Sequence, residues 1–309
     1  MRSRGCLVTL LSLLAGTVLV GCSGATTRND ATVTSRVPPT TTTVPPTTTT
    51  TTEQAGWTQG ATVNGAIVVD SQTVPEPDGH VVTIYRFRSG QTRFGLHVGS
   101  SDPPRGAATV VPDSGPMIGP DESPVLVAAF NGGFESGAAA GGFELNGQTL
   151  VPLQAGDASL VIDADGSARV GVWGQGVPAA GEQVASVRQN LPPLVVGGQP
   201  SPTVSTISAW GATLGGGAAV ARSALGEDAA GNLLYAASMD AVPGDLADAL
   251  VAAGVQTGME LDINPEWVQC AVAAAPGAPL AAGVPGQNRP GDQYQVGWTR
   301  DFVTVMAAH

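Results

Sequence analysis

Acidic and amide side chains alternate along one apolar stretch of this sequence, at Glu260, Asp262 and Asn264. If this stretch is a β-strand, the three polar residues share one face and the apolar residues between them share the other. Positions two apart on a strand lie about 7 Å apart, because each residue rises about 3.3 Å. Two carboxylates at this separation, extended by Glu266 and by Trp267 as a platform for a sugar ring, suit glycosyl transfer. A solvated edge strand would give the same pattern.

A second candidate site is the sequence Asn131-Gly132-Gly133, which follows an apolar run at 125–130. Glycines at the end of a strand allow positive φ and expose backbone N–H groups, which can hold an anion without any lysine. A plain turn is the alternative.

A third candidate is Arg222-Ser223, which lies in an apolar segment after three glycines. A guanidinium in such a setting needs a carboxylate or a phosphate as its partner. The alternative is a structural ion pair, for example with Asp262.

Several familiar catalytic motifs are absent from the sequence: a Gly-x-Ser-x-Gly elbow, a Walker loop and a His-Glu-x-x-His helix. The three histidines, His80, His97 and His309, are widely spaced. Any catalysis therefore depends on carboxylates, arginine, asparagine and backbone N–H groups. We expect Cys270, which has no histidine near it in sequence, to be a buried apolar residue rather than a nucleophile.

The charge of the chain excludes two classes of partner. All 13 basic residues are arginine, and 25 acidic residues bring the formal net charge to -12. A chain without a basic patch cannot neutralise the phosphates of nucleic acid or bind electrostatically to anionic lipid.

The N-terminus predicts export and a lipid anchor. Two arginines precede an apolar run at 6–20, which is too short to span a bilayer, and the sequence then reads Gly21-Cys22. We interpret 1–21 as a lipoprotein signal peptide, with Cys22 as the lipidated residue on the outer face of a bacterial cytoplasmic membrane. An ordinary signal peptide is the alternative. The lipidated N-terminus and a Thr/Pro-rich linker occupy 22–56, and the folded domain occupies 57–309.

Short β-branched runs bounded by turn residues predict a sheet-dominated α+β domain. A hairpin is expected at Ser89-Gly90, and one helix at 246–253, with Asp245 as its N-cap and Gly254 at its end. The expected strands are 66–70, 80–87, 92–98, 125–130, 159–163, 232–239 and 258–264.

Five short segments occur in an order that resembles the phosphodiester glycosidase family, and the resemblance extends over about residues 60–309. They are 131–134, 142–147, 189–195, 222–226 and the stretch from the helix ending at Gly254 to Leu261-Asp262. The glycine-rich loop that usually follows the strand aspartate in this family is replaced here by 263–267, and its usual Arg-Thr by Arg222-Ser223.

The resemblance implies hydrolysis of a sugar-1-phosphodiester in an envelope or exopolysaccharide glycan. It implies that Arg222, with Ser223 beside it, and the amides of Asn131, Gly132 and Gly133 bind the phosphate. The phosphate is a weak base and needs little protonation to leave, so the enzyme must chiefly stabilise charge.

The remaining roles implied by the resemblance fall on the polar strand and the loop after it. Asp262 would act as nucleophile or as base for water, with Glu260 or Glu266 in support, while Asn264 and Trp267 would bind the substrate. A divalent cation held by Asp262, Asn264 and Glu266 is an alternative, and no other cofactor is expected. A lipoprotein that binds a glycan or a partner without turnover is the second hypothesis, because the altered loop could have lost catalysis.

Overall fold

The computed structural model describes residues 56–76, 79–104, 114–138 and 140–308. The predicted signal peptide, Cys22 and nearly all of the Thr/Pro-rich linker lie outside these residues and stay predictions. In the described part of the chain, no helix is long and apolar enough to cross a membrane.

Strands dominate the folded part, and helices are few. The described residues form two α-helices, α1 (Pro243–Ala252) and α2 (Gln293–Val296), and four single 3₁₀ turns. The 3₁₀ turns are Ser123–Val125, Ser136–Ala138, Ile207–Ala209 and Leu214–Gly216. The expectation of a sheet-dominated domain with few helices is confirmed.

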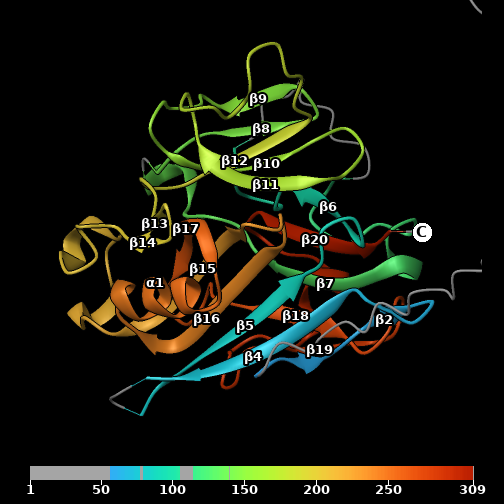
Figure 1. Cartoon of the computed structure of the whole chain (residues 1–309). Helices are drawn as coiled ribbons and strands as arrows, with labels where there is room; N and C mark the ends of the chain where they lie inside the picture. Colours follow the sequence, from blue (N-terminus) through green and yellow to red (C-terminus); the bar gives the residue numbers. More distant parts are fainter. Residues whose placement is uncertain (1–55, 77–78, 105–113, 139, 309) are drawn as a thin grey trace, which may run out of the picture. The chain divides into compact units, whose positions relative to one another are not determined.

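The largest sheet has eight strands, and every neighbouring pair in it is antiparallel. Helix α1 packs against one face of this sheet and buries Leu246 and Leu250 against Ile84 and Ala236 (Figure 1). In spatial order the strands are β1 (Thr58–Gln59), β4 (Val69–Pro75), β5 (Val81–Phe87), β16 (Leu233–Ala241), β15 (Val220–Asp228), β17 (Val255–Ile263), β13 (Val195–Val196) and β14 (Gln199–Pro200).

Two five-stranded antiparallel sheets complete the fold, together with the short pair β2 (Thr62–Val63) and β3 (Ala66–Ile67). The β10 sheet, at the top of Figure 1, has the order β11 (Ala168–Val172), β10 (Ala158–Ile162), β12 (Ser186–Gln189), β8 (Phe143–Leu145), β9 (Gln148–Val151). The β7 sheet has the order β19 (Leu280–Ala282), β18 (Cys270–Ala273), β7 (Leu126–Asn131), β20 (Phe302–Ala307), β6 (Thr92–His97).

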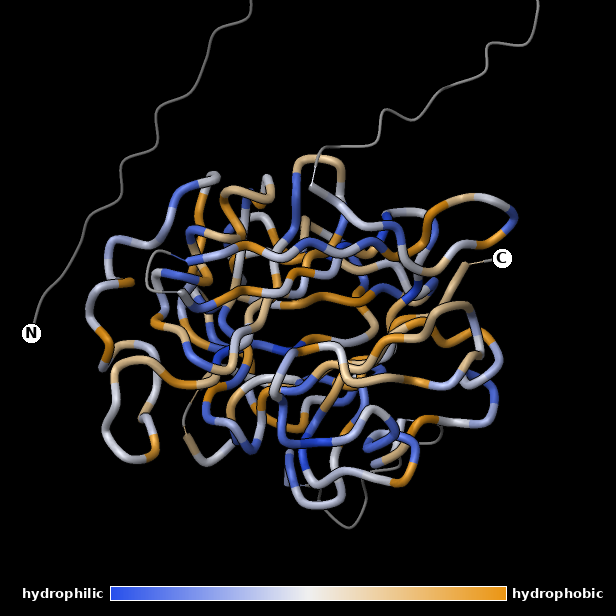
Figure 2. Tube along the Cα trace, turned by 90° about the horizontal axis from the view of Figure 1, so that it is seen from below, coloured by the Kyte–Doolittle hydropathy of each residue, from blue (hydrophilic) through white to orange (hydrophobic). Residues whose placement is uncertain are grey.

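One large apolar core joins the three sheets, and the apolar stretches of chain that form it run through the interior in Figure 2. Phe87 of the eight-stranded sheet stacks on Phe130 of the β7 sheet, with ring centroids 5.8 Å apart, and Leu160 of the β10 sheet belongs to the same core. Apolar burial of this extent is the main source of stability in such a domain.

Most local predictions are confirmed to within two residues. The strands expected at 80–87, 92–98, 125–130, 159–163 and 232–239 are β5, β6, β7, β10 and β16. All six residues of β7 are buried, as a continuous apolar run predicts for a strand covered on both faces. Gly254 follows α1 with a φ of 96°, which suits glycine.

Three local predictions are wrong. The strand expected at 66–70 is divided between β3, which ends at Ile67, and β4, which begins at Val69. The turn at Ser89-Gly90 does not form a hairpin, because β4 and β16 occupy both edges of β5, and β6 pairs with β20 in another sheet. Asp245 is not the N-cap of α1. The helix starts earlier, at Pro243, and the Asp245 carboxylate accepts a hydrogen bond from the Val242 amide at 2.8 Å.

The strand predicted at 258–264 is the second half of β17, and it contains an irregularity that the sequence pattern does not show. Arg222 of β15 pairs with Ile263, whereas Ala224 pairs with Glu260, so β17 has one extra residue between these pairs. A bulge of this kind breaks the two-residue alternation of side chains. It is the reason that Glu260 and Asp262 lie in different surroundings.

Candidate functional site

A pocket of about 630 Å³ opens where the ends of β7 and β17 meet the start of β20 and the segment 208–212. It contains charged groups and aromatic rings, the combination that small-molecule sites use. Its lining residues are Phe134, Glu135, Ala138, Leu191, Ser208, Ala209, Gly211, Ala212, Asp262, Ile263, Asn264, Trp267 and Arg300.

Asp262 lies in the wall of this pocket, and the residue is only 5% exposed. One carboxylate oxygen accepts a hydrogen bond from the Ile263 amide at 2.8 Å, and the other accepts one from Arg300 at 3.0 Å. Burial raises the pKa of Asp262 to about 7, against the opposing effect of the Arg300 guanidinium. The carboxyl group can therefore exchange a proton near neutral pH.

Arg300 is the main cation of the pocket, and the sequence reasoning did not find it. Its Nη2 donates to the Gly133 carbonyl at 3.1 Å as well as to Asp262, and its guanidinium carbon lies 4.8 Å from the centre of the Trp267 ring. Within the described part of the chain, the buried Nε has no hydrogen-bond acceptor. The available signal was an Arg-Asp pair directly before the last apolar strand, at 302–307.

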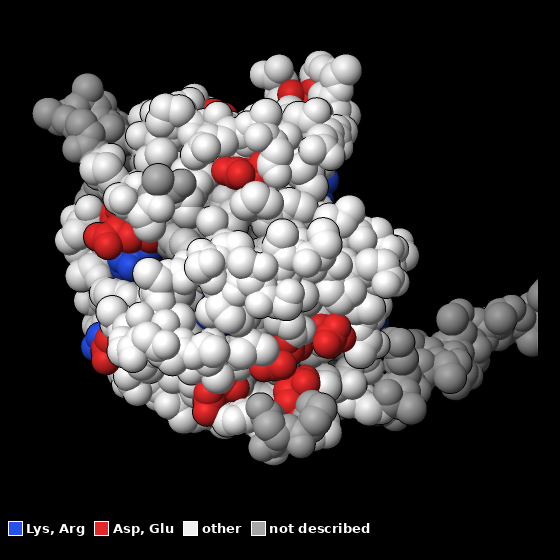
Figure 3. All heavy atoms as spheres, turned by 90° about the vertical axis from the view of Figure 1, so that its left-hand side faces the viewer, with Lys and Arg blue, Asp and Glu red and all other residues white. Residues whose placement is uncertain are grey.

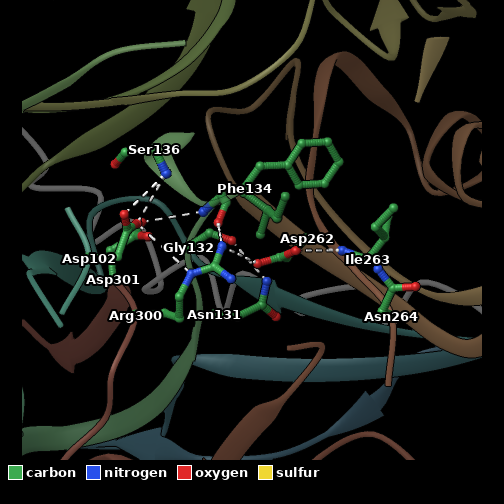
Figure 4. Close-up of polar contacts among 12 residues, drawn as sticks. Asp102, Asn131, Gly132, Phe134, Ser136, Asp262, Ile263, Asn264, Arg300 and Asp301 are labelled. Carbon is green, nitrogen blue, oxygen red and sulfur yellow. Dashed lines mark hydrogen bonds and ion pairs between the residues drawn. The ribbon is translucent and has the colours of Figure 1, made fainter. Parts of the chain in front are cut away.

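Arg300 lies between Asp262 on one side and Asp102 on the other (Figure 4), and its Nε is 3.9 Å from the Asp102 carboxylate. Burial raises the pKa of Asp102, and the negative charge of Asp301 adds to this effect. Both Asp102 oxygens also accept from the amide of Ser136, at 3.2 and 3.4 Å. The arginine is thus held in place by two acids from different segments.

The backbone amides of Gly132 and Gly133 already donate hydrogen bonds to another residue of the protein. The Gly132 amide donates to the Asp301 carbonyl at 3.0 Å, and the Gly133 amide donates to the Asp301 carboxylate at 3.3 Å. Arg188 completes this cluster by donating from Nε to the same carboxylate at 2.7 Å. We therefore correct the expected role of these glycines: their amides donate to the backbone carbonyl and the carboxylate of Asp301 and are not free for a substrate anion.

Asn131 and Ser223 are buried and connect strands instead of lining the pocket. The Asn131 side chain donates to the Ser223 hydroxyl at 2.9 Å and accepts from the Tyr235 hydroxyl at 3.0 Å. The Ser223 hydroxyl donates to the Asp262 carbonyl and accepts from the Asp262 amide, at 3.2 and 3.1 Å. The two residues fix the backbone of Asp262, so their effect on the pocket is through that residue.

Arg222 is a structural residue, which corrects the expectation that it binds phosphate. It is fully buried and donates to Glu260 at 2.7 Å and to the carbonyls of Trp210 and Ala241, each at 3.0 Å. Burial raises the pKa of Glu260 to about 8, although the Arg222 charge opposes this. The alternative of a structural ion pair is the one that holds, with Glu260 in place of Asp262 as the partner.

Of the three residues predicted in the loop after β17, two line the pocket and one lies outside its lining. Asn264, which has a φ of 74°, and Trp267 line the pocket, and the Asn264 side chain accepts from the Leu214 amide at 2.8 Å. Glu266 is exposed outside the pocket lining and pairs with Arg289 at 2.7 Å. No group of three acidic, histidine or cysteine side chains is arranged to hold a metal in the described residues. The three expected cation ligands instead have partners within the protein.

Acidic side chains are more prominent than basic ones on the molecular face shown in Figure 3, and most of that face has neither. This distribution agrees with the formal net charge of -12. A negatively charged ligand would therefore need a local cation to bind, and in the pocket lining that cation is Arg300.

No family model matches the chain, and no curated protein matches it. Among solved structures it is similar to the zebrafish N-acetylglucosamine-1-phosphodiester alpha-N-acetylglucosaminidase catalytic domain, auto-inhibited by its pro-peptide. The identity is 13%, the match covers 82% of this chain and 88% of that one, and the TM-score is 0.47.

Two further structures show similarity at the same distant level. One is a hypothetical protein from Synechocystis, with 13% identity, 79% and 63% of the two chains covered and a TM-score of 0.49. The other is a putative exported protein from Burkholderia pseudomallei, with 15% identity, 80% and 61% covered and a TM-score of 0.26. The matches span less than two thirds of these two chains. Similarity this low concerns the fold alone, and we take no residue roles from it.

Proposed function

We propose that this protein is an extracytoplasmic lipoprotein that hydrolyses a sugar-1-phosphodiester of an envelope or exopolysaccharide glycan in the pocket around Asp262 and Arg300. The observation that carries the proposal is the contact between these two side chains, 3.0 Å apart in the wall of an open pocket that also has an aromatic platform. A carboxyl group that titrates near neutral pH, next to a fixed guanidinium, suits the departure of a phosphate.

The chemistry at the phosphate end needs charge stabilisation more than strong acid catalysis. When the bond between the anomeric carbon and its oxygen breaks, the leaving group is a phosphate monoester, whose second pKa is about 6. A carboxyl group with a pKa of about 7 is matched to such a group and can donate its proton to the departing oxygen. Arg300 would neutralise the phosphate charge in a planar, bidentate contact. This gives Asp262 the role of acid, where the sequence predicted a nucleophile or base.

The sugar end of the proposed site is formed by aromatic side chains. Trp267 is partly exposed in the pocket lining, and Phe134 lies in the same lining. An indole ring stacks on the apolar face of a pyranose and leaves the hydroxyl groups free for polar contacts. The Arg300 guanidinium lies over the Trp267 ring, so a sugar on the ring and a phosphate on the guanidinium would bind side by side.

One observation favours the second function, a surface lipoprotein that binds a glycan or partner without turnover. The amides of Gly132 and Gly133 already donate to Asp301, so they add no donors for a developing negative charge. A pocket with fewer such donors stabilises a transition state less, while it can still hold an anionic sugar.

The test uses the full-length chain and methyl diesters of hexose 1-phosphates, with the free sugar and the methyl phosphate measured separately. We expect both products to form at equal rates and Arg300→Lys to raise KM, since an ammonium cannot make the bidentate contact. Arg289→Lys is the matched control, because Arg289 pairs with an exposed acid outside the pocket lining. Stabilisation by a sugar phosphate without product release would favour the binding protein, and the absence of both would overturn the proposal.

A further inference from the structure

The pocket lining contains a second carboxylate that the sequence reasoning did not select. Glu135 lies in the same lining as Asp262, and its side chain is exposed. Among the described residues it has no side-chain hydrogen bond or ion pair, whereas both Glu260 and Glu266 are paired with arginines. The carboxylates of the described lining are therefore Asp262, held by Arg300, and Glu135, which has no side-chain partner among the described residues.

The backbone on both sides of Glu135 is held firmly. The Phe134 amide donates to the Asn190 side chain at 3.1 Å, and the Phe134 carbonyl accepts from Arg188 at 2.5 Å. The Ser136 amide donates to the Asp102 carboxylate at 3.2 Å. A free carboxylate on a fixed backbone is the arrangement that a group acting on a substrate requires, because its position is set before the substrate binds.

We propose that Glu135 is the catalytic base of the site, the carboxylate that takes a proton from the attacking water. The inference rests on the proposed function and adds to it a residue with a defined role. The water oxygen bonds to the anomeric carbon while Glu135 accepts a proton from that water. The bond from the anomeric carbon to the phosphate oxygen breaks, and its electron pair stays on that oxygen, which Asp262 protonates. The products are the free sugar and a phosphate monoester, and the proton gained by Glu135 returns to solvent as Asp262 is reprotonated.

The contrast between the two environments supports this division of roles. Asp262 is buried, and its raised pKa keeps a proton available near neutral pH. Glu135 is exposed to water and is not buried beside a second acid in any described contact. Carboxylates whose surroundings differ in this way are the usual acid and base of a glycoside-cleaving site.

The experiment measures hydrolysis of a hexose 1-phosphate methyl diester by the full-length protein and by Glu135→Gln. We expect kcat to fall by about 10²- to 10⁴-fold, the usual contribution of a general base, with little change in thermal stability. Asp248→Asn is the matched control, since Asp248 is an exposed acid on α1, away from the pocket lining. This control should keep the wild-type kcat.

Two further measurements separate a catalytic role from a structural one. Sodium azide should restore turnover to Glu135→Ala by forming a glycosyl azide, because azide needs no base. The first sugar released by the wild type should have the inverted anomeric configuration, as a single displacement by water requires. The role of Glu135 would be overturned, with hydrolysis itself still established, by any of three results. These are an unchanged kcat in Glu135→Gln, a loss of kcat in Glu266→Gln instead, and a product with retained anomeric configuration. A wild-type protein that releases no product would overturn both proposals.

Discussion

Replacing Arg222 should damage the stability of the fold and leave the pocket intact. The side chain is fully buried and donates three hydrogen bonds, to Glu260 and to the carbonyls of Trp210 and Ala241. Arg222→Met keeps an unbranched apolar chain but leaves the acid without its partner and removes the hydrogen bonds that Arg222 donates to the two carbonyls. The same replacement at Glu260 leaves the guanidinium unpaired.

The magnitude follows from the burial of both groups. Removing one partner of a buried ion pair costs about 3–5 kcal/mol in the free energy of unfolding, because the remaining charge loses its compensation. For a domain of about 250 residues, each kcal/mol lowers the melting temperature by about 2–4 °C, so we expect a drop of about 6–20 °C. The double variant Arg222→Met/Glu260→Met has no charge left to bury. It should therefore be more stable than the sum of the single losses by at least about 2 kcal/mol.

The assay is equilibrium unfolding in urea at a pH above 8, where Glu260 is ionised, followed by tryptophan fluorescence, for the wild type, both single variants and the double variant. Thermal melting with and without a hexose 1-phosphate gives a second readout on the same samples. Since Arg222 is absent from the pocket lining, the ligand should raise the melting temperature of Arg222→Met by the same amount as that of the wild type. Measurements are made at a temperature where every variant is folded.

Either of two results would refute this reasoning. Single losses below 1 kcal/mol, or losses that add in the double variant, would show that the ion pair is not the source of stability. Normal stability in Arg222→Met combined with loss of the ligand effect would show that Arg222 acts on the ligand, as the family resemblance implied.

Three further outcomes are expected. Burial raises the pKa of Asp262 from 3.8 to about 7, so the folded state binds a proton more tightly than the unfolded state and its stability falls as the pH rises from about 4 to about 7. Asp262→Asn should remove this part of the pH dependence of the melting temperature. An unchanged pH profile would contradict the raised pKa. Gly132→Ala should lower the free energy of unfolding by about 1–3 kcal/mol or more, since the added Cβ would lie 1.8 Å from the Asp301 carboxylate. Gly137→Ala is the control, because its Cβ would meet nothing within 4 Å, and it should leave the free energy of unfolding nearly unchanged. Cys22→Ser should abolish metabolic labelling by palmitate, and labelling that persists would exclude the predicted lipid anchor.

Local pattern alone determined much of the fold. The apolar run at 125–130 predicts a strand buried on both faces, and the helix at 246–253 can be read from its apolar face and from Gly254. Both predictions depend on the residues of one segment, whose periodicity and turn chemistry act over a few positions. The alternation of apolar and polar residues likewise predicts the strand that contains Glu260 and Asp262. The three widely spaced histidines indicate that any catalysis depends on carboxylates and arginine.

The partners of the charged residues were decided by the tertiary structure. Arg222 and Glu260 are 38 positions apart, as are Asp262 and Arg300, and the sequence offers other acids for each arginine. One extra residue in β17 sends Glu260 into the core and Asp262 into the pocket, and local alternation cannot reveal such a bulge. Which acid pairs with which arginine depends on strand register and burial. Both arise from long-range packing, because the cost of a buried charge depends on every group around it.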